Sequence, residues 1–450
     1  MHRSIPTVLA LLGALAGTAV AGVPAEWTFE LQCRSSLDQS IPAFNLPYPS
    51  LLSSQYVSLG EDGAVAIRTV LEGSEGVFYG KGGEGGVIFS APAPFDPVWS
   101  STLDLRNGMI AIEMGSFNDG AQLYDTSGNL LRDFVPGGSE GTSGFSGVTL
   151  TSGGAICYRG DFGFTSDKIV IDEFVDDVRM QTRVADTSSG AYSFLFAPEI
   201  NDSLQVVSNT IPESGPSRRI VRFDTLSVPA MPITVAETGG AWSSFVNSTA
   251  IAQSGHVAFS ARRSSDSIWV VNHWDGTNTT PIADGTNSGI QNGSFANFPP
   301  VVNSNGWVGF RASDVEHDST GVWVGDGDDL VKLIEYDQLI ETDLGALALG
   351  FDFGGDTGKQ VVNGVIDIND QGQVAFAAFL RNGTIGVFVA TPVESCLADL
   401  TGDGALDFFD VSDFLDALAA MEPAADFTGD GLYDFFDVSD FLDAFGAGCP

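Results

Sequence analysis

The chain has 450 residues, of which 19 are Lys or Arg and 58 are Asp or Glu, so its formal net charge at pH 7 is −39. This acidic excess excludes electrostatic binding to nucleic acid or to an anionic membrane, because both partners need clustered basic side chains. Hydrophobic residues make up 43% of the sequence, enough for a large core, whereas 54 glycines and only four cysteines argue against a helical bundle and a disulfide-dense scaffold.

The first 21 residues have the features of a secretory signal peptide. Arg3 precedes an apolar run from Val8 to Leu15, and Ala19-Val20-Ala21 supplies the small residues that signal peptidase needs. The run is shorter than the roughly 20 apolar residues that span a bilayer, and no later segment is apolar enough to do so. We therefore expect cleavage after Ala21 and a mature chain, without a transmembrane segment, that is secreted or attached to the cell surface.

A sequence pattern recurs through the body of the chain. It consists of a polar turn, a glycine, one variable residue and then Val or Ile, a small residue and an aromatic residue or Ile. Clear copies begin at Gly63, Gly255, Gly306 and Gly372, and weaker copies lie near positions 108, 154 and 203. A second apolar run follows each clear copy 12 to 15 residues later. Successive copies lie 45 to 52 residues apart, except for a last step of 66 residues, which we attribute to an insertion around residues 345–359.

This spacing is typical of β-propeller blades, each made of three or four short antiparallel strands. Turns such as Glu61-Asp62-Gly63 supply the Gly and Asn residues that tight hairpins require. A series of β-sandwiches is the alternative, but a sandwich domain needs about 100 residues, roughly twice the observed period. We predict a mainly β fold, with a seven-bladed propeller over residues 22–395. The repeat also resembles tandem-repeat regions of secreted bacterial proteins, which implies a fold and no activity.

The two ends of the repeat region predict how the ring closes. The last unit ends after Phe388–Pro392 without a final strand, and Trp27–Cys33 forms a strand with no partner of its own. Pairing the N-terminal strand with the last blade would cover both exposed sheet edges.

Residues 396–450 contain 13 acidic residues and no Lys or Arg, arranged as two copies of one unit that are 27 residues apart. Ca²⁺ needs six or more oxygen ligands, and a 12-residue loop supplies them from positions 1, 3, 5, 7, 9 and 12, with Gly at position 6. Both copies fit that template, and an amphipathic helix follows each. We predict two bound Ca²⁺ ions. Their ligands are Asp399, Thr401, Asp403, Ala405, Asp407 and Asp410 in the first loop, and Asp426, Thr428, Asp430, Leu432, Asp434 and Asp437 in the second, with Ala405 and Leu432 acting through backbone carbonyls and Asp407 through water.

Position 12 is Asp, where ordinary EF-hands have Glu, and only one helix follows each loop. This combination resembles the type I dockerin family, whose duplicated loop-helix module docks onto cohesin domains. The resemblance implies calcium binding and an anchoring role for residues 396–450, with a cohesin-like or other surface protein as partner. The chain differs from cellulosomal dockerins at Phe408-Phe409 and Phe435-Phe436, where those proteins have small hydroxyl residues that help to select cohesin. It also lacks the Lys or Arg that usually follows.

The four cysteines leave the disulfide pattern open. Cys396 and Cys449 bracket the C-terminal module, and a bridge between them would close a 54-residue loop, stabilising the module by roughly 3 to 4 kcal/mol. Cys33 and Cys157 fall on predicted strands and are either bridged or buried as free thiols.

No sequence motif identifies a catalytic site. His256, His273 and His317 stand in no metal-binding or triad arrangement. Residues 80–85 match the glycine pattern of a dinucleotide-binding motif, but that motif precedes a helix and these residues precede a predicted strand. We therefore interpret them as a hairpin turn. We interpret residues 326–329 as a polar blade turn rather than a cation site.

Two further features leave enzyme chemistry open. Carboxyl pairs for glycoside cleavage cannot be picked out of so acidic a chain. Four tryptophans either stack on sugars or pack between blades; they are Trp269, Trp274, Trp307 and Trp323.

Together these features predict a secreted or cell-surface calcium-binding interaction protein. Its propeller would be the binding domain, with polysaccharide as one candidate ligand, and its dockerin-like module would anchor it to a partner protein. The alternative is an extracellular carbohydrate-active enzyme of polysaccharide catabolism, either a hydrolase acting on glycosyl bonds or a lyase, with its active site in the propeller's central channel.

Overall fold

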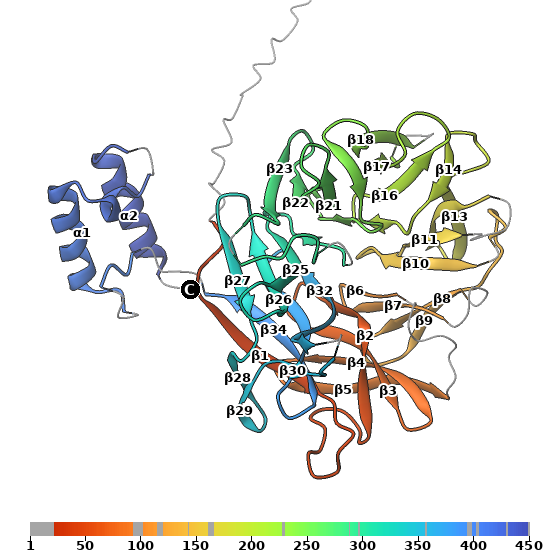
Figure 1. The fold of residues 1–450 in the computed structure, drawn as a ribbon, viewed down its shortest axis with the longest axis horizontal. Coiled ribbons are helices and arrows are strands. Elements are labelled where there is room, and N and C mark those ends of the chain that lie inside the picture. The colour runs from red at the N-terminus through yellow and green to blue at the C-terminus, as the bar shows by residue number, and fades with distance from the viewer. Residues whose placement is uncertain are drawn as a thin grey trace, which may run out of the picture.

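The computed structural model confirms the predicted propeller. Seven antiparallel sheets radiate around a central axis, and two helices follow them at the C-terminal end (Figure 1). The predicted signal peptide lies outside the described residues. The described ranges are 22–92, 102–114, 120–142, 144–160, 166–226, 230–287, 289–295, 298–355, 358–393, 398–401, 405–428 and 431–448.

The first three blades are regular four-stranded sheets, each running from an innermost to an outermost strand. Blade 1 contains β2 (Ser50–Leu59), β3 (Val65–Leu71), β4 (Ser74–Lys81) and β5 (Glu84–Pro92). Blade 2 contains β6 (Leu103–Arg106), β7 (Met109–Glu113), β8 (Ala121–Asp125) and β9 (Leu130–Phe134). Blade 3 contains β10 (Phe145–Leu150), β11 (Ile156–Gly160), β12 (Lys168–Val175) and β13 (Val178–Asp186).

Blades 4 and 5 each have an inner edge that is split into two short strands. Blade 4 contains β14 (Tyr192–Leu195), β15 (Glu199–Ile200), β16 (Gln205–Pro212), β17 (Arg219–Asp224) and β18 (Met231–Glu237). Blade 5 contains β19 (Trp242–Phe245), β20 (Ala250–Ile251), β21 (Val257–Arg263), β22 (Trp269–Trp274) and β23 (Thr279–Asp284). Blade 6 contains β24 (Val301–Val302), β25 (Val308–Asp314), β26 (Ser319–Gly325) and β27 (Leu330–Ile334).

The last blade confirms the predicted closure through the N-terminal strand. It contains β32 (Val362–Ile368), β33 (Val374–Phe379) and β34 (Ile385–Pro392), and β1 (Trp27–Arg34) is its outermost strand. β1 pairs antiparallel with β34 from Trp27 opposite Pro392 to Arg34 opposite Gly386. The predicted insertion before this blade forms two hairpins, β28 (Leu339–Thr342) with β29 (Gly345–Ala348), and β30 (Phe351–Asp352) with β31 (Lys359–Gln360).

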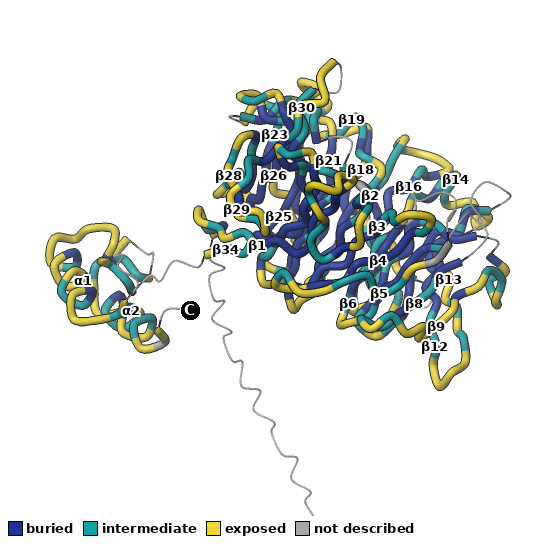
Figure 2. Tube along the Cα trace, turned by 90° about the horizontal axis from the view of Figure 1, so that it is seen from below, coloured by how far each residue is buried: buried dark blue, intermediate teal, exposed yellow. Residues whose placement is uncertain are grey.

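The repeated Val-small-aromatic pattern is explained by packing between blades. The buried residues of the propeller form seven apolar clusters, each shared by two neighbouring blades. Buried residues, dark blue in Figure 2, run through the strands of the propeller. In β33, Phe376 packs toward blade 6, whereas Ala375 and Ala377 face blade 1, where Phe78 fills the space. Both faces of each sheet are therefore buried, and large side chains oppose small ones across each interface.

The C-terminal module has a small core of its own. α1 (Phe408–Ala420) and α2 (Phe435–Ala447) are joined by a short 3₁₀ turn (Pro423–Ala425). Phe414 of α1 and Phe441 of α2 stack with their ring centroids 4.0 Å apart, and Phe427 packs edge-on against both. No helix among the described residues is both long and apolar enough to cross a membrane.

Candidate calcium loops and a carboxyl-lined channel

Each C-terminal helix begins with the same pair of aspartates. Asp407 is the N-cap of α1 and accepts a hydrogen bond from the backbone N–H of Phe409, while the Asp410 side chain accepts one from the N–H of Asp407. Asp434 and Asp437 repeat this arrangement at α2. Such capping boxes satisfy N–H groups that a helix leaves unpaired at its start, and the acidic side chains also suit the positive end of the helix dipole.

The last predicted ligand of each loop also holds the start of that loop. Asp410 Oδ1 accepts the N–H of Thr401 at 3.1 Å, and the Thr401 hydroxyl donates to Asp399 at 3.2 Å. The structure therefore brings positions 1, 3 and 12 of the first loop together.

The second loop repeats this geometry. Asp437 Oδ1 accepts both the N–H (3.1 Å) and the hydroxyl (3.0 Å) of Thr428, and Asp426 accepts the N–H of Gly431 at 2.9 Å. Asp403 and Asp430, the predicted ligands at position 5 of each loop, lie outside the described residues.

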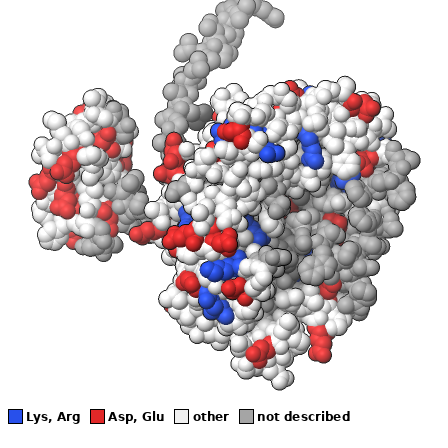
Figure 3. All heavy atoms as spheres, viewed as in Figure 1, with Lys and Arg blue, Asp and Glu red and all other residues white. Residues whose placement is uncertain are grey.

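Asp410 and Asp437 are 0% exposed, and each accepts hydrogen bonds from backbone N–H groups of its own loop. Backbone N–H groups of Asp407 and Thr401 lower the pKa of Asp410, and those of Asp434 and Thr428 lower the pKa of Asp437. Both groups are therefore carboxylates at neutral pH. The visible face of the module carries acidic side chains and no basic ones (Figure 3). Residues 396–450 contain no Lys or Arg. Each buried carboxylate thus lacks a basic side chain from its own module.

The first two residues of each helix form exposed aromatic pairs. Phe408 is 75% and Phe409 64% exposed, and Phe435 and Phe436 are exposed to 75% and 66%. In each pair the two ring centroids lie 6.3 Å apart, at the same angle. The module therefore presents two matching apolar surfaces, one beside each loop.

The propeller contains a second group of carboxyl side chains, which sequence reasoning did not single out. Equivalent positions just before the repeated turn of each blade line a central cavity of about 150 Å³. These residues are Ser58, Asp104, Thr149, Glu199, Ala250, Val301 and Asp367.

Hydrogen bonds fix these carboxyl groups between blades. Asp104 accepts the N–H of Leu150 from the next blade at 2.7 Å, and Asp367 accepts the N–H of Leu59 at 2.8 Å across the closure. Glu199 accepts the N–H of Ile251 at 3.3 Å.

The charge states in the channel differ from those of ordinary carboxyl groups. Burial raises the pKa of Glu199 to about 8, with a further contribution from the charge of Asp104. Burial raises the pKa of Asp367 to about 6, although Arg106 opposes this shift. Burial disfavours the charge of Arg106, but the surrounding carboxylates raise its pKa above the ordinary value, so it stays protonated. Its Nε lies 3.5 Å from Asp104.

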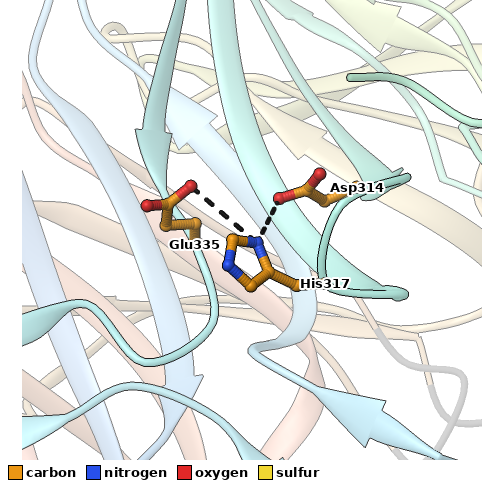
Figure 4. A group of neighbouring side chains, drawn as sticks. All are labelled: Asp314, His317 and Glu335. Carbon is orange, nitrogen blue, oxygen red and sulfur yellow. Dashed lines mark hydrogen bonds and ion pairs between the residues drawn. The ribbon is translucent and has the colours of Figure 1, made fainter.

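A third cluster lies on blade 6 (Figure 4). His317 Nδ1 is 2.8 Å from Asp314 and 4.0 Å from Glu335, which is a donor set that a metal ion could use. However, the ammonium group of Lys332 lies 3.0 Å from Asp314 and 2.5 Å from Glu335. Lys332 already supplies the positive charge, so we interpret this cluster as a salt-bridge network.

The structure also shows where the predicted tryptophans and two glycine- or aspartate-rich turns lie. Trp274, Trp307 and Trp323 are at most 6% exposed, so they pack in the core and offer no sugar-stacking surface. Residues 82–83 form the turn between β4 and β5 and have positive φ angles, as expected for a hairpin. Asp326 accepts the N–H groups of residues 328 and 329 within a blade turn.

The structure describes two of the four cysteines. Cys33 and Cys157 are buried free thiols, which is the second of the two alternatives that the sequence left open. Burial raises the pKa of both thiols. Cys396 and Cys449 lie outside the described residues.

Comparisons with known proteins find similarity in structure alone. No protein-family model and no curated protein matches this sequence. The chain is similar in structure to the N-terminal domain of Nup159, with 9% identity and a TM-score of 0.41 over 82% of this chain and 98% of that chain. It is also similar to the Dos1 propeller, with 12% identity and a TM-score of 0.42 over 82% and 95% of the two chains. The β-propeller domain of the trilobed protease from Pyrococcus furiosus has 10% identity and a TM-score of 0.37 over 64% and 95%. Similarities this low carry no information about function.

Proposed function

We propose that the protein is a secreted or cell-surface interaction protein whose C-terminal dockerin-like module binds two Ca²⁺ ions and anchors the propeller to a partner protein. The observation that supports this most strongly is the pair of buried carboxylates, Asp410 and Asp437, each enclosed by an acidic loop without basic residues. Backbone N–H groups stabilise both carboxylates, but neither loop holds a positive charge beside them. A Ca²⁺ ion in each loop would supply that charge and use oxygen ligands that the loops already bring together.

The exposed phenylalanine pairs suit the anchoring role. Exposed aromatic side chains are enriched at protein interfaces, where their burial provides most of the binding energy. A partner for Phe408-Phe409 or for Phe435-Phe436 would present an apolar pocket. Because the rest of the module is acidic, that pocket would have a neutral or basic rim.

Limited proteolysis of the full chain tests the calcium role. With Ca²⁺ the region 396–450 should resist cleavage, and with a chelator it should be cut while the propeller stays intact, as read by mass spectrometry of the fragments. Asp410→Asn should remove protection of the first loop. The matched control is Asp413→Asn, an exposed aspartate on the same helix, which should leave protection unchanged. Equal cleavage with and without Ca²⁺ would contradict the proposal.

The carbohydrate-active enzyme remains a prediction. The channel offers carboxyl groups, but Asp104, Glu199 and Asp367 accept backbone hydrogen bonds between blades, so their positions are explained without a reaction.

A further inference from the structure

The charged groups of the central channel favour a neutral ligand. Arg106 lies beside Asp104, with 3.5 Å between its Nε and the carboxyl oxygen Oδ1, so these two charges offset each other. Burial raises the pKa of Glu199 to about 8, so this side chain is neutral at pH 7. A cation in the channel would be repelled by the guanidinium group of Arg106, and an anion by the carboxylates of Asp104 and Asp367.

Two further acidic residues line the channel, but the blade turns already use them. Asp370 accepts hydrogen bonds from the N–H (2.7 Å) and the hydroxyl (2.8 Å) of Ser304. Glu61 accepts the N–H of Asp370 at 3.0 Å. The positions of both groups are therefore explained without a bound cation.

The lining also holds hydrogen-bond donors that lack a partner. The Nε–H of Arg106 and the hydroxyl of Thr249, a residue that is 3% exposed, have no hydrogen-bond partner among the described residues. Glu199 Oε2 accepts the N–H of Ile251 at 3.3 Å, while no described residue bonds to Oε1, and the neutral acid has a proton to donate. Buried polar groups normally have partners, so these donors indicate a missing water or ligand beside them.

Hydrogen-bond acceptors lie next to these donors. Ser58 Oγ is 3.4 Å from Asp104 Oδ1 and 3.4 Å from Asp367 Oδ2, and it accepts the N–H of Leu105 at 2.9 Å. A hydroxyl has a single proton, so Ser58 donates to only one of the two carboxylates at a time. The other carboxylate can accept from a ligand. A ligand that fits both kinds of group must donate and accept hydrogen bonds, as hydroxyl groups do.

The channel has a polar side and an apolar side. From blade 7 round to blade 4 the equivalent channel positions carry side-chain oxygens; they are Asp367, Ser58, Asp104, Thr149 and Glu199. Blades 5 and 6 place Ala250 and Val301 there, and Pro299 and Pro300 extend this apolar side. The cavity of about 150 Å³ has room for on the order of ten water molecules. The lining therefore suits a small ligand with a polar edge and an apolar face.

We propose that the central channel binds one neutral sugar ring, with its hydroxyl groups hydrogen-bonded to Arg106, Asp104 and Glu199. A sugar ring carries hydroxyl groups around its edge, and its C–H groups form an apolar face. The hydroxyl groups would accept from Arg106 and Glu199 and donate to Asp104, while the C–H face would pack against the apolar side on blades 5 and 6. The sugar would be the ligand of the propeller in the proposed interaction protein, and its binding would not need the calcium loops.

Calorimetric titration of the full chain in chelator tests this site, with glucose, galactose, mannose and xylose as probes. At least one of these neutral sugars should bind, with one site per chain. Glucosamine and glucuronate carry a positive and a negative charge, so each should bind at least about tenfold more weakly than the neutral sugar that binds. An oligosaccharide of that sugar separates two sources of the ring. Equal or tighter binding identifies the end of a sugar chain as the ligand, and weaker binding identifies the free sugar.

Substitutions of Glu199 place the site in the channel. Glu199→Ala should weaken sugar binding at least about tenfold, because it removes the donor and leaves the ligand hydroxyl unpaired. Glu199→Gln keeps a neutral donor and acceptor, so its affinity should stay within about threefold of the unmodified chain. The matched control is Glu213→Ala, an exposed carboxyl group outside the cavity lining, which should leave binding unchanged. The melting temperature checks that each variant is folded. If Glu199→Ala does not fold, Thr149→Leu replaces it, because its larger side chain should fill the cavity and abolish binding.

The outcomes separate this site from the proposed calcium role. Failure of all four neutral sugars to bind overturns the channel site, and so does binding that neither Glu199→Ala nor Thr149→Leu weakens. Glucosamine or glucuronate that binds as tightly as the neutral sugar also overturns it. Sugar binding in a chain whose C-terminal region is cleaved equally with and without Ca²⁺ supports the channel site while contradicting the calcium role.

Discussion

Deleting β1 should open the propeller, because this strand is the outermost strand of the last blade and joins the two ends of the ring. The perturbation is removal of residues 27–33 after the signal peptide. It breaks the ladder between β1 and β34 and exposes the edge of β34. An exposed edge of this kind also favours pairing between molecules.

The size of the effect can be estimated from burial. Leu31 is 8% and Cys33 0% exposed, and the rings of Trp27 and Phe29 are half-buried against Trp307 and Phe376. A fully buried apolar side chain contributes about 1.5 to 3 kcal/mol. Two buried and two half-buried side chains therefore contribute about 6 kcal/mol, a large part of the roughly 5 to 15 kcal/mol that separates folded from unfolded domains.

Thermal melting and limited proteolysis measure this effect. The deletion should lower the melting temperature by on the order of 10 °C and broaden the transition. The control is a chain that ends at residue 395, which keeps every propeller strand and should melt like the propeller of the full chain. A β1 deletion that melts at the same temperature as this control would refute the role of the strand in closure.

Three further predictions concern single side chains. Burial lowers the pKa of His273 to about 4, so His273 binds a proton more readily in the unfolded chain than in the folded one. The free energy of unfolding should therefore fall by up to about 3 kcal/mol as the pH drops from 6.5 to 4, and His273→Gln should weaken this pH dependence in denaturant titrations. Phe441→Ala should lower the free energy of unfolding of the Ca²⁺-loaded C-terminal module by about 3 to 5 kcal/mol, because it removes one of the two stacked rings. Residues 396–450 should then become sensitive to protease, and unchanged protection would contradict the stacked core. Arg34 is fully buried and donates two hydrogen bonds to Asp343. Asp343→Ala would leave this buried positive charge without its partner, so it should lower the free energy of unfolding in urea by about 3 kcal/mol. Arg34→Met removes the buried charge itself and should therefore cost less.

The sequence predicted the fold because the blades repeat a strong local pattern. The Gly-x-Val-small-aromatic motif marks the second strand of each blade, where both faces are buried and apolar residues run without interruption. Turn glycines such as Gly63, Gly255 and Gly372 have positive φ angles that other residues rarely adopt, so they mark the same corner of each blade. The unpaired N-terminal strand predicted closure through simple strand counting.

The carboxyl-lined channel was not predicted because the innermost strands have little sequence signal. β15, β20 and β24 are only two residues long, and one face of the inner strands borders the cavity rather than a neighbouring sheet. Glu199 and Asp367 are far apart in sequence, so only the ring brings them to one cavity. Aligning the residues just before each repeated turn would have found them, because equivalent positions in a propeller converge on its axis.

The C-terminal loops show the opposite situation. The spacing of the predicted ligands is local, and the structure brings positions 1, 3 and 12 of each loop into contact; the full ligand set stays a prediction. The sequence reading did not assign Asp407 and Asp434 as helix caps, although an aspartate followed three residues later by another acidic residue is a known start signal.

The most direct test of the proposed calcium binding is circular dichroism of residues 396–450 alone. Without Ca²⁺ its 13 acidic side chains repel one another, and two bound ions would neutralise four of those charges. We predict that helix content rises on adding Ca²⁺ and is lost on adding a chelator, and that Asp403→Ala and Asp430→Ala each abolish one of two binding equivalents. The same helix content in Ca²⁺ and in chelator would contradict the account.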